Sequence, residues 1–409
     1  MYEVRRLRSG LPVVLDGTLQ VRTFTICVAV GRSSRDEPAD RIGQSHMLEH
    51  AVMSAAQSDT GRSVSAWATG LGGQSNAATS KDFMAFWLRV PPEHAVESTR
   101  RLCQALVRPR FTDELAVHER RVVVQELRAA AADPLDRADE AFHARLFPDH
   151  PLGRPVGGSA DDFPELSADI LAAALAEALA TGALCVSLVG SPAQLEPAYQ
   201  ELAGGGFAEL DRTGDRPKRL PPLAGPATDL AGQPAETDAD YAYLVAGGRG
   251  ADRSDPLWAG FQLLTAAVGG TPGSLLYERV RSELGIAYEL QSIHSAYYDC
   301  GVWRVIAGSQ PSNVDTVRAV VRDSLEDIAR NGLPAPELAA ARAQAAGSVL
   351  IDNEDPVELA HINAYWGAED LADPAPVVSS LARIAAAGNE QVAAAAARLL
   401  GGWTDAVCS

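Results

Sequence analysis

The sequence lacks an apolar run long enough to cross a bilayer. Its longest apolar stretches, residues 171–180 and 184–190, are too short or too interrupted, since a transmembrane helix needs about 20 apolar residues. The N-terminus also lacks the continuous apolar stretch of a signal peptide, because charges and a Gly-Leu-Pro interrupt it. We therefore expect a cytoplasmic protein with no membrane partner.

Cysteine is scarce and scattered. None of the five cysteines forms a CxxC pair, and an odd number fits reduced thiols better than a disulfide framework. Cys27 and Cys185 lie inside strand-like apolar runs, where cysteine usually acts as a small hydrophobic residue. We expect the cysteines to be structural.

An excess of basic residues is also missing. The formal net charge is −18, which argues against nucleic acid as a partner because there is no basic excess to neutralise its phosphates. The negative charge could attract basic peptides over a distance, although solubility alone explains it.

The 409 residues leave room for two or three domains, each with its own core. Strand-like and helical segments alternate through the first half, which predicts mixed α/β layers. Residues 211–238 hold five prolines and no periodicity, so we interpret them as a linker. This divides the chain into domains at 1–210 and 239–409.

The two halves resemble each other in one short segment. CVAVGRSSRDEP (27–38) and LVAGGRGADRSDP (244–256) both lead from a strand into a Gly-Arg turn, and their Arg-x-Asp/Glu-Pro endings align Arg35 with Arg253. In this alignment the histidine-rich segment at 46–50 falls on Leu264, Ala267 and Val268. The similarity predicts a duplicated domain whose second copy fills the corresponding positions with core residues.

Two histidines and a glutamate lie close together in GQSHMLEHAVM (43–53). On a helix, His46 and His50 are i and i+4 and project from one face, a spacing that suits two ligands of a tetrahedral zinc. Glu49 lies beside them, and H-x-x-E-H is a metallopeptidase signature. Incidental histidines on a partly exposed helix are the alternative.

A hydrolytic zinc needs a third protein ligand and an open position. Segment 119–127, ERRVVVQEL, offers Glu126 as this ligand. Glu119 lies two helical turns earlier on the same face, where it could contact a ligand histidine without binding the metal itself. A glutamate buried on so apolar a helix is costly unless a cation receives it. The alternative is that both are solvated charges on a helix face.

The spacing of these motifs resembles the pitrilysin/insulinase family of zinc metallopeptidases, and the resemblance extends over nearly the whole chain. The segments that carry it are SGLPVVL, SSRDEPADRIGQSHMLEH, GGQSNAATSKDF, HERRVVVQEL, FPDHPLGRPVGG and GGTPGSLLYERVRSELGIAYELQS. It implies an α+β fold: two homologous α/β domains, each a mixed, largely antiparallel sheet covered by helices, related by duplication and joined by the linker.

The resemblance also implies roles for individual residues. His46, His50 and Glu126 would bind one zinc per chain, and Glu49 would be the general base that takes a proton from the attacking water. Tyr288 would donate to the oxyanion, and Arg281 would hold the substrate backbone or the oxyanion region, both from the half without zinc ligands. Asn76 and Ala77 would lie on an edge strand that binds an extended peptide.

We therefore expect a zinc metalloendopeptidase that hydrolyses peptides or unfolded precursor segments inside a closed chamber. As a short two-domain chain it resembles bacterial members that form dimers, either homodimers or heterodimers with a related subunit. Two alternatives stay open: one subunit of a heterodimeric processing peptidase, or a catalytically silent structural subunit. Such silent subunits tend to lose zinc ligands, whereas this sequence keeps all three and the base.

Overall fold

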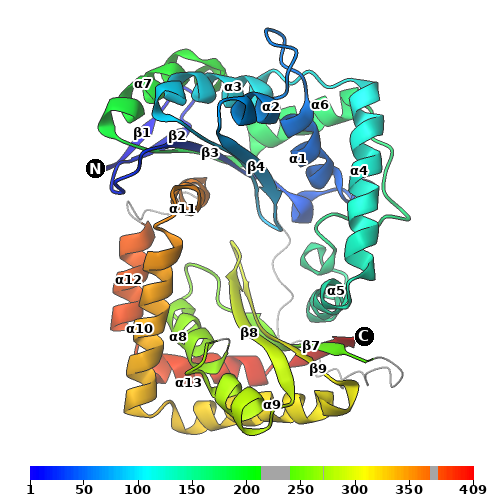
Figure 1. The fold of residues 1–409 in the computed structure, drawn as a ribbon, viewed down its shortest axis with the longest axis vertical. Helices are drawn as coiled ribbons and strands as arrows, with labels where there is room; N and C mark the ends of the chain where they lie inside the picture. The colour runs from blue at the N-terminus through cyan, green and yellow to red at the C-terminus, as the bar shows by residue number, and fades with distance from the viewer. Residues whose placement is uncertain (213–239, 270, 369–375) are drawn as a thin grey trace. The chain divides into compact units, whose positions relative to one another are not determined.

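The computed structural model describes residues 1–212, 240–269, 271–368 and 376–409, which form two compact units (Figure 1). Unit 1 contains Met1–Arg128, Pro155–Arg219 and Ile351–Val377, and unit 2 contains Ala129–Arg154, Leu220–Leu350 and Val378–Ser409. Each half of the sequence thus contributes a segment to the unit formed mainly by the other half. The predicted linker, 211–238, lies outside the described residues except for its first two.

Unit 1 is built on a six-stranded sheet in the order β1-β2-β6-β3-β5-β4, in which only the β2–β6 pair is parallel. The strands are β1 (Tyr2–Arg6), β2 (Pro12–Asp16), β3 (Phe24–Gly31), β4 (Gln74–Thr79), β5 (Met84–Val90) and β6 (Ala183–Val189).

Most helices of unit 1 cover one face of this sheet (Figure 1). The apolar residues of β3 alternate, so that Phe24, Ile26 and Val28 enter the core on this side. Ser167 caps the helix that follows it, accepting a hydrogen bond from the Ile170 N–H. The helices are α1 (Gln44–Ser54), α2 (Val64–Gly70), α3 (Ala95–Val107), α4 (Asp113–Ala132), α6 (Ala168–Thr181) and α7 (Pro192–Gly204), with short helices η1 (Ser34–Asp36), η2 (Pro92–His94) and η4 (Gly206–Glu209).

The opposite face of the sheet is covered by α11 (Pro356–Ala368), a helix from the second half of the sequence (Figure 1). Cys27 and Cys185 face this helix as buried free thiols, in the structural role expected of them. The Asn363 amide of α11 donates a buried hydrogen bond of 2.9 Å to Asp16. Residues from nearly opposite ends of the sequence therefore share one core.

Unit 2 repeats this arrangement with a four-stranded antiparallel sheet in the order β10-β7-β9-β8. Helices α8, α9, α10, α12 and α13 supply the core on one face, and α5 from the first half of the sequence packs on the other. The elements are β7 (Ala242–Gly250), β8 (Ala287–Ala296), β9 (Gly301–Ser309), β10 (Thr404–Cys408), α5 (Pro134–Leu146), α8 (Trp258–Val268), α9 (Val314–Asn331), α10 (Ala335–Asp352), α12 (Pro376–Ala386) and α13 (Asn389–Leu400), with short helices η3 (Pro151–Gly153), η5 (Tyr277–Glu283) and η6 (Pro311–Asn313).

The two sheets share their strand order. The order β6-β3-β5-β4 in unit 1 corresponds to β10-β7-β9-β8 in unit 2. The alignment of the two halves also places the start of β3, Phe24, on the start of β7, Ala242. Leu264 and Val268 of α8 are buried in the core, as the repeat predicts. The predicted fold, two α/β domains with largely antiparallel sheets, is confirmed. None of the helices in the described ranges combines the length and apolar character that crossing a bilayer requires.

His294 on β8 should make the stability of unit 2 depend on pH. Its ring donates from Nε2 to the Ala251 carbonyl (3.0 Å) and accepts at Nδ1 from the Gln262 amide (3.0 Å), and burial lowers its pKa from 6.5 to about 4. The backbone contact to Ala251 and the charges of Asp255 and Arg398 modify this shift but do not reverse it. Between these pH values the unfolded chain binds a proton that the folded chain does not, so stability falls as the pH falls.

We expect His294 to account for a loss of at most about 3 kcal/mol in the free energy of unfolding between pH 7 and pH 4. Urea unfolding of the wild type and of His294→Gln over this range would measure it. The variant should lose less stability than the wild type on acidification. Equal losses in the two proteins would contradict the assignment.

Candidate metal centre

The N-terminus of α1, the helix that carries the two histidines, is held in place by Gly43 and Glu37. Gly43 precedes α1 with φ +94°, and a Cβ there would lie 2.6 Å from both the Gly157 carbonyl oxygen and the Phe163 ring. The buried Glu37 carboxylate accepts hydrogen bonds from the N–H groups of Gly43 (2.8 Å) and Ser45 (2.5 Å). Glu37 thus satisfies free donors at the helix N-terminus and orients the first turn, a role that the sequence analysis missed.

The structure brings His46, His50 and Glu126 together, with one potential ligand atom of each lying within 4.8 Å of the others. The Nε2 atoms of His46 and His50 lie 3.7 and 3.4 Å from the same Glu126 carboxylate oxygen. These separations exceed normal hydrogen bonds. They are close to the roughly 3.3–3.6 Å between donor atoms around a tetrahedral zinc with bonds of about 2.0–2.2 Å. Two imidazoles and one carboxylate therefore fit zinc in both chemistry and spacing.

Helix α4 presents its two glutamates differently. The Glu119 side chain is 8% exposed and its carboxylate lies 3.3 Å from Nδ1 of His50, whereas the Glu126 side chain is 56% exposed. The argument that burial forces Glu126 to bind a cation is therefore wrong, since Glu119 is the buried member of the pair. A hydrogen bond from Nδ1–H to Glu119 leaves Nε2 of His50 free to bind a metal.

The ring of His46 is enclosed on its other side by a glycine. A Cβ on Gly157 would lie 2.9 Å from Nδ1 of His46 and 2.7 Å from the Leu127 side chain, so a larger residue would displace the imidazole. Nδ1 is buried and has no hydrogen-bond partner within the described residues. Burial lowers the pKa of His46, which favours the neutral ring that binds metals.

The proposed base is held by a residue that the sequence analysis did not single out. The Thr79 hydroxyl donates a hydrogen bond of 2.6 Å to the Glu49 carboxylate. Thr79 ends β4, the edge strand that also holds Asn76 and Ala77. Asn76 is exposed and Ala77 is buried in the core. Because side chains alternate along a strand, Thr79 lies on the same face as Ala77. This spacing of two residues was the sequence signal from which Thr79 could have been found.

Arg281 and Tyr288 contact each other within unit 2. The Arg281 guanidinium lies 4.7 Å from the centre of the Tyr288 ring and 4.8 Å from that of Tyr277, and it donates to the Tyr288 carbonyl at 3.4 Å. Tyr288 is 76% exposed and occupies a β-bulge between Ala287 and Glu289, a feature that redirects side chains. Their action together with the residues of unit 1 stays a prediction.

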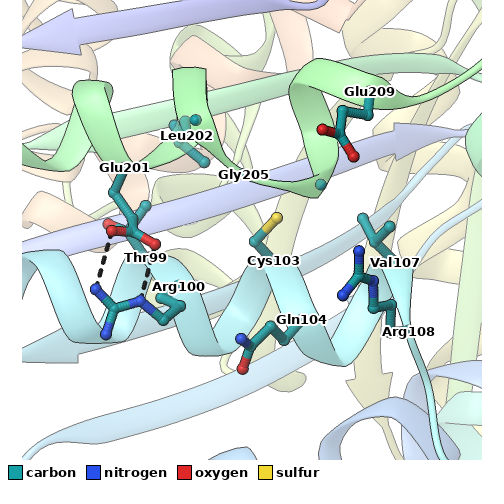
Figure 2. Close-up of a pocket in the computed structure, with 12 residues that line it drawn as sticks. Thr99, Arg100, Cys103, Gln104, Val107, Arg108, Glu201, Leu202, Gly205 and Glu209 are labelled. Atoms are coloured by element: carbon teal, nitrogen blue, oxygen red, sulfur yellow. Dashed lines mark hydrogen bonds and ion pairs between the residues drawn. The ribbon is translucent and has the colours of Figure 1, made fainter.

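A cavity of about 340 Å³ lies elsewhere in unit 1, between α3, α7 and η4 (Figure 2). Its wall includes the ion pair of Arg100 with Glu201, at 2.8 Å, and none of the predicted site residues lines it. Burial raises the pKa of the Cys103 thiol in this cavity to about 11. The thiol therefore stays protonated at neutral pH and is a poor nucleophile.

Two family models match this chain. Residues 13–160 match the family model described as Insulinase (Peptidase family M16), and residues 171–345 match the model described as Peptidase M16 inactive domain. The first match contains His46, His50 and Glu126, and the second contains Arg281 and Tyr288. Between them the two matches extend over most of the chain.

Individual proteins and solved structures are also similar to this chain. An uncharacterized zinc protease of Streptomyces coelicolor is 29% identical over 97% of this chain and 87% of its own, and one of Mycobacterium tuberculosis is 28% identical over 85% and 80%. The fold is similar to that of a protease from Helicobacter pylori (TM-score 0.86, 17% identity, 100% and 99% coverage). It is also similar to a chain of complex III2 from Candida albicans (TM-score 0.78, 13% identity, 99% and 95% coverage). The chain belongs to the insulinase family, peptidase family M16.

Proposed function

We propose that the protein is a zinc-dependent endopeptidase that hydrolyses peptides or unfolded precursor segments. The observation that carries this proposal is the convergence of His46, His50 and Glu126 beside Glu49 on the same helix as the histidines. Three protein ligands leave a fourth position open, as in catalytic rather than structural zinc sites. The family membership supports the same chemistry.

Each residue of the cluster has a distinct task in this proposal. His46, His50 and Glu126 would hold the zinc, which when bound polarises a carbonyl and lowers the pKa of water. The Glu49 carboxylate would accept the proton of the attacking water. Glu119 keeps the His50 ring oriented through Nδ1. Gly157 leaves room for the His46 ring.

Strand β4 suggests how a substrate would bind. Among the described residues it pairs with β5 alone and forms the edge of the sheet, and its side chains on one face lie against α1. An extended peptide added to this edge would run past Asn76 and Ala77, with its backbone supplying the hydrogen bonds. Such binding selects unfolded segments by shape more than by sequence. The net charge of −18 favours the approach of basic segments.

The family resemblance assigns two further tasks to unit 2. Tyr288 would donate to the oxyanion and Arg281 would hold the substrate backbone, within a closed chamber. These tasks remain part of the proposal, as do a homodimer or heterodimer with a related subunit and a cytoplasmic location. A catalytically silent structural subunit is the alternative, and the presence of all three metal ligands together with Glu49 disfavours it.

Removal of zinc should abolish cleavage. We expect about one zinc per chain by elemental analysis, no measurable cleavage of an unfolded test peptide after dialysis against a chelator, and recovery after one equivalent of zinc is added. Mass spectrometry of the products would measure the cleavage. Circular dichroism of the metal-free protein should be unchanged, because each unit has a large apolar core that includes none of the three proposed ligand side chains. Full activity without metal would contradict the proposal.

A further inference from the structure

The Glu49 carboxylate has a single side-chain hydrogen-bond partner among the described residues, the hydroxyl of Thr79 at 2.6 Å. The same hydroxyl lies 3.4 Å from the Ser45 carbonyl. It has one proton to donate, and the shorter contact, to a charged acceptor, is the stronger. This bond restricts rotation of the Glu49 side chain. It occupies one carboxylate oxygen, Oε2, and leaves Oε1 available.

Thr79 is itself fastened at the end of β4. The Ser33 and Ser34 hydroxyls donate to the Ser80 carbonyl at 2.7 and 3.1 Å, and the Arg35 N–H donates to the Lys81 carbonyl at 3.2 Å. Three hydrogen bonds from one short segment, residues 33–35, therefore hold two carbonyl groups of the backbone that follows Thr79.

A buried ion pair strengthens this attachment. The Arg35 guanidinium lies 2.9 Å from the Asp82 carboxylate, and each side chain is only 1% exposed. The Tyr365 hydroxyl of α11 donates to the second Asp82 oxygen at 3.2 Å. Such a pair is costly to break, because either charge would remain buried without its partner.

The same segment also fixes the helix that carries Glu49. Two residues beyond Arg35, the Glu37 carboxylate binds the N–H groups of Gly43 and Ser45 at the start of α1. We call residues 33–37 the clamp segment. Its first part binds the end of β4 and its last residue binds the start of α1, and the two elements lie side by side (Figure 1). The clamp segment therefore sets the spacing between Thr79 and Glu49.

We propose that Thr79 is a positioning residue that aims the Glu49 carboxylate, with the clamp segment holding the two in register. The inference rests on the proposed peptidase function for its consequence in catalysis. Its structural content, the orientation of one side chain, can be observed without any activity. No substrate contact of Thr79 is required.

The test compares Thr79→Val, which keeps the shape and removes the hydroxyl, with Thr79→Ser, which keeps the hydroxyl. We expect Thr79→Val to lower kcat about 10- to 100-fold, the effect of losing a hydrogen bond to a charged group, with KM changed less than about twofold. Thr79→Ser should stay within about threefold of the wild type. Zinc content should be equal in all three, because Thr79 is not part of the metal cluster.

Thr25→Val is the matched control. Thr25 is a fully buried threonine of β3 in the same sheet, and its hydroxyl has no hydrogen-bond partner within the described residues. This variant should cleave like the wild type. Should Thr79→Val fail to fold, Thr79→Ala removes the same hydroxyl without adding an apolar group.

Crystal structures of the wild type and Thr79→Val separate this inference from the proposed function. We expect one orientation of the Glu49 carboxylate in the wild type, and a rotated or split carboxylate in the variant. An inactive wild type would refute the peptidase function, and the two crystal structures would still decide whether Thr79 positions Glu49. An unmoved carboxylate in Thr79→Val, or an unchanged kcat in an active enzyme, would overturn the inference.

Discussion

Replacement of Glu49 by Gln is expected to slow peptide cleavage by about 10²- to 10⁴-fold, the usual contribution of a general base. The amide has nearly the same shape and can still accept the Thr79 hydrogen bond at its oxygen, but it cannot take a proton from water. Glu49 is not one of the three residues of the metal cluster. The zinc should therefore remain bound at the wild-type level.

Initial rates on an unfolded peptide, measured together with zinc content, would test this expectation. The combination matters because loss of metal would also stop cleavage and would imitate the loss of a base. Cleavage by Glu49→Gln at the wild-type rate would refute the role of Glu49. Cleavage lost together with zinc would show that Glu49 holds the metal instead.

Replacement of Glu126 by Gln should weaken zinc binding more than the same change at Glu119. Glu126 offers one of the three clustered atoms that could bind the metal, whereas Glu119 contacts Nδ1 of His50. Loss of a group that orients a ligand histidine usually lowers metal affinity about 10- to 100-fold. We expect Glu119→Gln to lie in this range and Glu126→Gln to exceed it.

Competition with a chromogenic chelator would measure both zinc affinities in the same way. The two variants are well matched, because each removes one negative charge from the same face of α4. An affinity loss in Glu119→Gln equal to that in Glu126→Gln would mean that the two carboxylates share the metal. Unchanged affinity in Glu126→Gln would exclude it as a ligand.

The part of the site that follows from local geometry could be predicted from the sequence. His46 and His50 are one helical turn apart, so a helix alone places their rings side by side, and the ring centres lie 5.0 Å apart. The core residues Leu264 and Val268 followed from the alignment of the two halves. In both cases the pattern and the structure depend on the same spacing along the chain.

How deeply each side chain of a helix is buried could not be predicted in this way. Glu119 and Glu126 lie on one face of α4, yet only Glu119 is buried, because burial depends on how far the packed surface extends. Thr79 was missed for a related reason. The alternation of side chains along β4 shows which face Thr79 occupies, but it does not show that the Glu49 carboxylate lies next to this face.

Helix α11 shows a similar limit at the level of the fold. Apolar residues surround most of its circumference, which indicates a helix that is buried on several sides. The pattern does not say which sheet covers it, and its actual partner is encoded in the first half of the sequence. Only the tertiary structure contains that pairing.

This pairing has a consequence for how the protein is made. When a ribosome has released only the first half of the chain, the sheet of unit 1 still has one bare apolar face that includes Val14, Cys27 and Cys185. The face is covered only after α11 emerges, and such long-range contacts form slowly. We therefore expect the first half of the chain to stay aggregation-prone until the second half has been synthesised.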